Sequence, residues 1–122
     1  MEYKFVIKGR LPSANEYIEA CHNWKARASM KRDYDFLCQA HMTKLRGVHL
    51  EAVCISIVWY EENEKRDPDN VSFGKKFIFD ALQKAKIIDN DGRKQIKAIS
   101  EKFEVDRKNP RIEVTLTEYE EA

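Results

Sequence analysis

The alternation of apolar and polar residues predicts four β-strands. At the N-terminus, Tyr3, Phe5 and Ile7 stand between charged residues, which is the period-two pattern of a strand with one buried face. A later stretch, HLEAVCISIVWY, is rich in β-branched side chains and is expected to form a central strand. The predicted strands cover residues 2–8, 49–60, 95–105 and 111–117, with a turn at 108–110 between the last two.

Helical spacing of apolar residues predicts one short helix and two long ones. Ser13 followed three residues later by Glu16 is a capping-box pattern, which indicates a short helix beginning there. The first long helix is expected at about 28–45, and the second opens within 66–70 and runs to about Lys86. The buried face predicted for the second long helix consists of Phe73, Phe77, Ile78, Ala81, Leu82 and Ala85.

These elements follow one another as β-α-β-α-β-β, which predicts an α+β fold. Helices should pack on one face of a mixed or antiparallel sheet. A chain of 122 residues and 14.4 kDa is expected to form a single domain over 1–122, with an acidic C-terminal fringe at 118–122.

Charge and composition restrict the possible partners only weakly. The chain has 22 Lys and Arg against 21 Asp and Glu; four of these acids lie in the last ten residues, so residues 1–112 hold 22 basic and 17 acidic residues, a net charge of +5. A moderately basic body is compatible with a nucleic-acid ligand. No segment is long and apolar enough to span a bilayer, and no secretory signal is visible, so we expect a cytoplasmic protein with no membrane partner. Three cysteines without a C-x-x-C pair indicate reduced thiols.

Two aspartates that flank a proline are the first candidates for chemistry. Pro68 favours an extended residue before it, and alternate side chains of an extended segment share a face, so Asp67 and Asp69 can point at one spot. Paired carboxylates suit Mg²⁺ or Mn²⁺. The alternative is that Asp69 or Asn70 only caps the following helix.

Further charged residues follow on that helix and after it. At helical spacing Asp69, Lys76 and Asp80 fall on one stripe, which would bring a fixed cation toward the two carboxylates. The alternative is a solvent-exposed Lys76–Asp80 pair four residues apart. A second acidic cluster, Asp89-Asn90-Asp91-Gly92, follows the helix and can equally be turn chemistry.

Taken together, these motifs resemble the RusA family of Holliday junction resolvases. The resemblance consists of Asp67-Pro68-Asp69-Asn70, Lys76, Phe79-Asp80-Ala81-Leu82, Lys84-Ala85 and Asp91 in order, preceded by Leu11-Pro12-Ser13-Ala14-Asn15-Glu16-Tyr17. It covers most of the chain. It implies a homodimeric, Mg²⁺-dependent endonuclease of DNA recombination and repair that binds four-way junctions and nicks them symmetrically. It also suggests a prophage origin.

The resemblance also implies roles for individual residues. Asp67, Asp69 and Asp91 become metal ligands for Mg²⁺, with Mn²⁺ as a possible substitute, and Lys76 becomes the catalytic lysine. In the best-known family form the lysine lies four residues after the second aspartate, where this chain has Phe73, so Lys75 is the alternative to Lys76. Asn70 and Asp80 are expected to orient the ligands, and Asp89 is the alternative to Asp91 as the third metal ligand.

DNA would be held by basic residues, since phosphate contacts supply most of the affinity. The candidates are Lys25, Arg27, Lys31, Arg32, Lys65, Arg66, Lys75, Arg93 and Lys94. Two alternatives stay open: a branched-DNA-binding protein without turnover, and a metal-dependent nuclease that acts mainly on flaps or forks.

Overall fold

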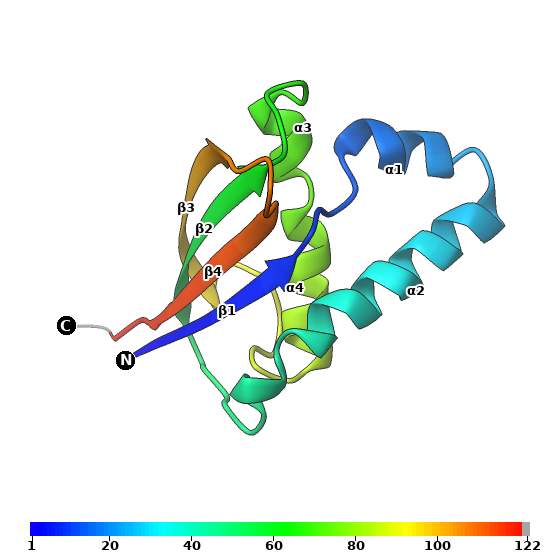
Figure 1. Ribbon diagram of the computed structural model, residues 1–122. Helices are drawn as coiled ribbons and strands as arrows, with labels where there is room; N and C mark the ends of the chain where they lie inside the picture. Colours follow the sequence, from blue (N-terminus) through cyan, green and yellow to red (C-terminus); the bar gives the residue numbers. More distant parts are fainter. Residues whose placement is uncertain (121–122) are drawn as a thin grey trace.

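The computed structural model, described here for residues 1–120, forms one four-stranded sheet with its helices packed against a single face (Figure 1). The strands are β1 (Glu2–Lys8), β2 (Val53–Glu61), β3 (Ile96–Val105) and β4 (Arg111–Glu118). Their order in the sheet is β1-β4-β2-β3. The β1–β4 and β4–β2 pairs are antiparallel and the β2–β3 pair is parallel, so the sheet is mixed.

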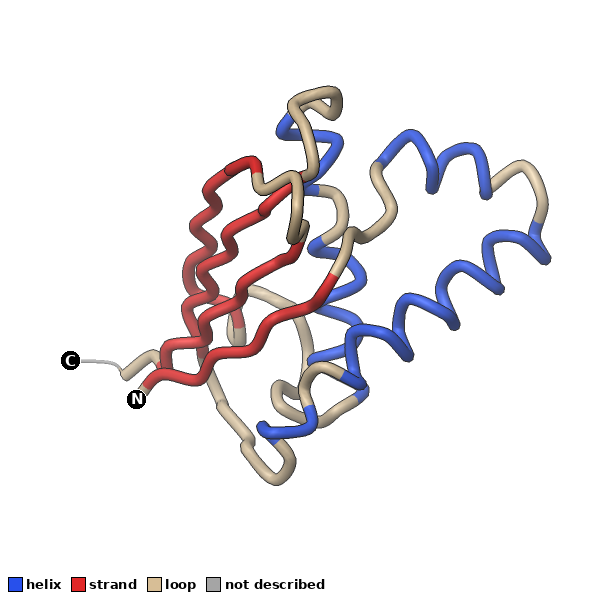
Figure 2. Tube along the Cα trace, in the orientation of Figure 1, coloured by secondary structure: helices blue, strands red, loops and turns tan. Residues whose placement is uncertain are grey.

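The helices occupy the connections between strands, as Figure 2 shows by colour. They are α1 (Ala14–Ala20), α2 (Trp24–Ala40), a 3₁₀ turn η1 (Thr43–Leu45), α3 (Pro68–Ser72) and α4 (Lys75–Lys84). The predicted α+β class, the β-α-β-α-β-β order and the central position of the second strand are confirmed.

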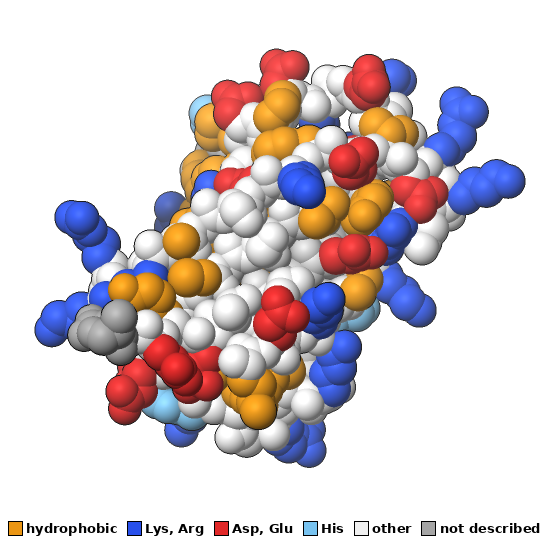
Figure 3. Space-filling view, turned by 90° about the vertical axis from the view of Figure 1, so that its left-hand side faces the viewer, with side chains coloured by type: hydrophobic (Ala, Val, Ile, Leu, Met, Phe, Trp, Pro, Cys, Tyr) orange, Lys and Arg blue, Asp and Glu red, His pale blue; other side chains and the backbone are white. Residues whose placement is uncertain are grey.

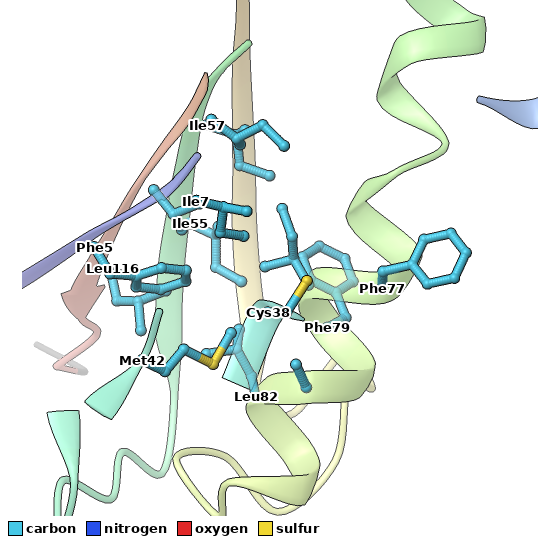
Figure 4. Packing of buried hydrophobic residues seen from close by; sticks show 14 of the residues in the cluster. Phe5, Ile7, Cys38, Met42, Ile55, Ile57, Phe77, Phe79, Leu82 and Leu116 are labelled. Atoms are coloured by element: carbon cyan, nitrogen blue, oxygen red, sulfur yellow. The ribbon is translucent and has the colours of Figure 1, made fainter. Parts of the chain in front are cut away.

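The core lies between the sheet and the helices α2 and α4. Alternate residues of β2 point into it, so Ile55 and Ile57 are at most 2 % exposed while Ser56 faces outward. Phe5 from β1, Cys38 from α2 and Leu82 from α4 close this core (Figure 4). Burial raises the pKa of the Cys38 thiol to about 12. Figure 3 views the opposite, open face of the sheet, where uncharged atoms fill the centre and charged side chains surround them.

The first long helix begins and ends earlier than predicted. It covers Trp24–Ala40 instead of 28–45, because the side chain of Asn23 accepts hydrogen bonds from the backbone N–H groups of Lys25 and Ala26 and caps the helix there. The predicted end at Leu45 is wrong because the chain leaves the α-helix at His41 and continues as the 3₁₀ turn η1.

The second long helix is divided into α3 and α4 at Phe73 and Gly74. Here the backbone hydrogen bonds join residues three apart, from Gly74 N–H to Val71 C=O and from Phe77 N–H to Gly74 C=O. A Cβ on Gly74 would lie 3.0 Å from Leu11 Cβ and 3.2 Å from the Trp59 ring, so glycine favours this close approach of helix and sheet. Ala85, predicted to be buried, is exposed at the helix end.

Within the described residues no helix is long and apolar enough to cross a membrane. All three cysteines are free thiols. The predicted acidic fringe at 118–122 begins with Glu118 at the end of β4, and its last two positions, 121 and 122, lie outside the described residues.

Candidate functional site

The acidic loop, which we define as residues 66–70, connects the end of β2 to α3. Asp67 is the N-cap residue with extended backbone angles, and Pro68 is the first helical residue, so Asp69 already lies in the first turn. The extended stretch predicted through Asp69 is therefore limited to Asp67. The Asp67 side chain makes no capping hydrogen bond, and both aspartates are exposed and in no ion pair among the described residues.

The N-terminal segment, residues 10–17, holds the acidic loop in place. Arg66 donates to the Leu11 carbonyl at 3.2 Å and forms an ion pair with Glu16. The same Glu16 carboxylate accepts from the Ser13 N–H, which completes the predicted capping box. The Asn15 N–H donates to the side-chain oxygen of Asn70 at 3.0 Å. Two motifs 50 residues apart in the sequence are thus in direct contact.

A second arginine fixes the end of β2 beside this loop. Arg10 donates from Nε and Nη2 to Glu61 at 3.2 and 2.7 Å, and from Nη1 to Glu62 at 2.6 Å. A pocket of about 250 Å³ opens next to Asp67, with Glu61 on one side and Phe103 and Val105 from the end of β3 on the other. Asp67 therefore borders a recess that reaches the edge of the sheet.

Behind the loop, Glu101 of β3 connects β2, α3 and α4. Its carboxylate accepts hydrogen bonds from Trp59 Nε1 at 2.8 Å, Ser72 Oγ at 2.9 Å and Lys75 Nζ at 2.8 Å. Burial acts to raise the pKa of Glu101, but these three donors and the charge of Lys75 outweigh it and hold the pKa below its ordinary value. Glu101 is thus an ionised structural residue.

The two candidate lysines have different surroundings. Lys75 is bound to Glu101 and also donates to Ser72 at 3.0 Å. Lys76 lies 3.7 Å from Asp80, with both side chains more than a third exposed, so this pair contributes only a few tenths of a kcal/mol. The tight turn at Gly74 also interrupts the helical stripe that was predicted to run from Asp69 to Lys76. Of the two, Lys76 is the lysine that is available to a ligand.

Asp91 lies at the opposite end of the sheet from Asp67 and Asp69. Because β2 and β3 are parallel, Val53 pairs with Ile96, and the loop before β3 meets the start of β2. The acidic loop follows the other end of β2, whose nine residues span about 26 Å at roughly 3.3 Å per step. Figure 1 shows this separation between α3 and the loop after α4. Over residues 1–120, no cluster of three or more potential ligands that could hold a metal ion forms.

Asp91 itself is exposed, and its backbone N–H donates to the Asn90 side chain. The alternative ligand, Asp89, lies 3.0 Å from His49. Of the two aspartates, Asp91 is thus the one whose side chain has no ion pair among the described residues.

The predicted DNA-binding residues fall into three groups. Lys25, Arg27, Lys31 and Arg32 are exposed on α2, and Arg93 and Lys94 are exposed in the loop before β3. Lys65 is exposed beside the acidic loop, whereas Arg66 and Lys75 are engaged in the internal contacts described above. Arg66 and Lys75 therefore have structural partners, whereas the other seven have no ion pair among the described residues.

Sequence reasoning missed Arg10, Glu61 and Glu101 as residues that shape this site. Glu61 was visible as an acid that ends an apolar strand, and at 7 % exposure it is the only buried charged residue among residues 1–120. Glu101 had a similar signal, because it stands between Ile99 and Phe103 on the strand face that is otherwise apolar.

Comparison with known proteins adds no assignment. Neither a scan against models of protein families nor a search of curated proteins found a match to this chain. The RusA resemblance stays a prediction that rests on the residues themselves.

The lowered pKa of Glu101 predicts a pH dependence of stability. We expect Glu101→Gln to lower the free energy of unfolding at neutral pH by about 1–3 kcal/mol, because the charged acceptor of Trp59 and Lys75 is lost. Because the pKa of Glu101 is lowered in the folded protein, the contribution of its charge to stability is fully present above the ordinary value of 4.5. This contribution is lost as the pH falls through the folded-state pKa. Urea unfolding should show a constant difference between wild type and variant above pH 4.5 that shrinks below it.

The matched control is Glu104→Gln, which changes an exposed glutamate of the same strand that has no ion pair among the described residues. Its effect on stability should be small at every pH. A wild-type to Glu101→Gln difference that grows on acidification would contradict the structural role assigned to Glu101.

Proposed function

We propose that this protein is a divalent-metal-dependent endodeoxyribonuclease that resolves four-way DNA junctions by paired nicks, as the RusA resemblance implies. Its place would be in DNA recombination and repair in the cytoplasm, where its substrate is found. The chemistry is phosphodiester hydrolysis, and the residues that we assign to it are Asp67, Asp69, Asp91 and Lys76.

One observation supports this proposal above the others. Asp67 stands at an N-cap position without making the capping bond, although Arg66 is its sequence neighbour and could have neutralised it. Arg66 instead binds Glu16, so Asp67 and Asp69 are left as two uncompensated carboxylates on a firmly held loop. Such a pair is self-repulsive and is relieved by a cation.

These side chains suit Mg²⁺ in their chemistry. Exposed carboxylate oxygens are hard ligands, and Mg²⁺ needs only one or two of them because it retains waters and takes phosphate oxygens from a substrate. When bound, the metal would neutralise phosphate charge and make water a better nucleophile. Asp67 and Asp69 would hold it, Asn70 would keep the loop in register with Asn15, and Lys76 would stabilise negative charge on the leaving oxygen.

The third carboxylate requires a second copy of the chain. Asp91 and the acidic loop lie at opposite ends of β2 and β3, so one chain does not bring them together. β3 is an edge strand, and an antiparallel β3–β3 pair related by a two-fold axis would bring the start of one β3 toward the end of the other. Asp91 of the partner subunit would then approach Asp67 and Asp69, twice per dimer.

The surface of β3 supports such a pair. Ile99, Phe103 and Val105 are 43, 41 and 49 % exposed, although by register they share the face of the buried Ile55 and Trp59. Apolar side chains at an open sheet edge can be buried by a second copy of the same strand. We therefore propose β3 as the dimer interface.

The activity is tested with a labelled synthetic four-way junction. Wild type with Mg²⁺ should give paired symmetric nicks, and a chelator should abolish them. Asp67→Asn, Asp69→Asn and Asp91→Asn should each reduce nicking by about 100- to 1000-fold, since each removes a charge that stabilises the transition state. Flaps and replication forks of the same sequence serve as competing substrates.

The control for this series is Glu64→Gln, an exposed acid beside the same pocket that has no predicted role. It should nick like wild type. A wild-type protein that binds the junction but cuts it with neither Mg²⁺ nor Mn²⁺ would identify a binding protein without turnover, and faster cutting of flaps or forks would change the substrate.

The two lysines can be separated by comparing activity with stability. Lys76→Met should reduce nicking with little change in the free energy of unfolding, because its pair with Asp80 is exposed. Lys75→Met should destabilise the protein by about 1–2 kcal/mol, because Glu101 loses its charged partner. Urea unfolding and junction nicking measure both effects. Loss of activity in Lys75→Met alone, at unchanged stability, would reverse the assignment.

A site shared between two chains makes a distinctive prediction for mixtures. Asp67→Asn and Asp91→Asn are each inactive alone, but a heterodimer of the two has one site with all its aspartates intact. After denaturation and joint refolding, an equal mixture should recover about a quarter of the wild-type sites, and each active dimer should make single nicks instead of paired ones.

Sites contained within one chain would give no recovery in this mixture. The interface itself is tested by Phe103→Asp, which should sediment as a folded monomer and lose nicking. Val6→Asp is the matched control, because Val6 is similarly exposed, at 40 %, on the edge strand at the other side of the sheet.

A further inference from the structure

The α1–α2 arm, which we define as residues 14–32, carries an exposed aromatic residue among unpaired cations. The arm projects away from the sheet beside the acidic loop (Figure 1). α1 has no buried residue, and positions 21–28 are all exposed. Trp24, the first residue of α2, is 69 % exposed, although tryptophan has the largest apolar surface to hide from water.

The positive charge of the arm is concentrated in the first half of α2. The stretch WKARASMKR, residues 24–32, has four cations and no acid, and none of the four forms an ion pair within residues 1–120. At 100° per residue Arg27 and Lys31 lie within about 60° of the direction of Trp24, so the ring and two cations share one face of the helix. The Lys25 ammonium lies 5.7 Å from the centre of the same ring.

The opposite side of the arm has a different character. A groove between α1 and α2 is lined by Glu16 and Glu19 together with Ala26 and Met30. An anionic ligand would avoid these glutamates. The outer face with Trp24, Arg27 and Lys31 is therefore the surface that fits a polyanion, and the tryptophan ring adds a flat apolar platform to it.

We propose that Trp24 stacks on the exposed face of a DNA base at a branch point, while Arg27 and Lys31 bind the adjacent phosphates. This inference rests on the proposed function, since it assumes a branched DNA ligand. Cations bind any duplex through its phosphates, but an aromatic ring gains only where a base face is exposed, as at a junction or in a single strand. Trp24 would thus supply the preference for branched over continuous DNA.

The test measures binding in the presence of chelator, so that it is independent of cleavage. The probes are a fluorescein-labelled four-way junction and a continuous duplex of the same length, followed by anisotropy. Trp24→Ala should weaken junction binding about tenfold and leave duplex binding within about twofold, whereas Trp24→Phe should retain most of the affinity. Arg27→Ala and Lys31→Ala should weaken both and each reduce the salt slope by about one.

Phe36→Ala is the matched control. Phe36 is 75 % exposed on the same helix, about 120° around it and about 18 Å along it from Trp24, so its loss should change neither affinity. Intrinsic fluorescence gives a second measurement, because Trp59 is buried and only Trp24 is accessible. The junction should quench wild-type emission and leave that of Trp24→Phe nearly unchanged.

Each other outcome has a definite meaning. Junction binding by Trp24→Ala equal to that of wild type, or an equal loss on junction and duplex, would overturn the stacking role while leaving the nuclease proposal intact. A change in sedimentation of Trp24→Ala without a change in DNA binding would identify the arm as a protein interface. Absence of any DNA binding by wild type would overturn both proposals.

Discussion

The carboxylate of Glu101 is the contact on which the geometry of the rest depends. It is the acceptor shared by Trp59 of β2, Ser72 at the end of α3 and Lys75 at the start of α4. These contacts bring the junction of the two helices onto the sheet, where the Trp59 ring passes close to Gly74. The direction in which α3 leaves the sheet, and with it the position of the acidic loop, follows from this arrangement.

On the side away from Glu101, two arginines hold the acidic loop. Arg10 and Arg66 each bind glutamates, at Glu61 and Glu16, so both arginines near the loop are neutralised by acids other than Asp67. The capping box joins this system, because Glu16 serves both the Ser13 N–H and Arg66. These contacts hold the backbone of the loop on both sides while the two aspartates stay exposed, as the proposed cation site would require.

Most of the fold could be predicted from the sequence, because its strands have a strong period-two pattern. The start of α2 could not, since positions 24–28 are all exposed and show no apolar periodicity; only the capping residue Asn23 marked it. The division at Gly74 depends on a tertiary contact with Trp59 and has no local signal. The separation of Asp91 from Asp67 follows from the parallel pairing of β2 and β3, and strand order cannot be deduced from periodicity alone.

Two groups of unpaired charges, of opposite sign, matter for the proposed function. The acidic loop keeps two carboxylates without a partner, while the outer face of the arm keeps Arg27 and Lys31 without one. The chain has enough residues of both signs to pair them, as it does at Arg10, Arg66 and Lys75. A polyanion that arrives with divalent cations satisfies both places at once, because its phosphates fit the arm and its metal ions fit the loop. Under the proposed function, a nucleic-acid substrate with its divalent cations accounts for both groups together.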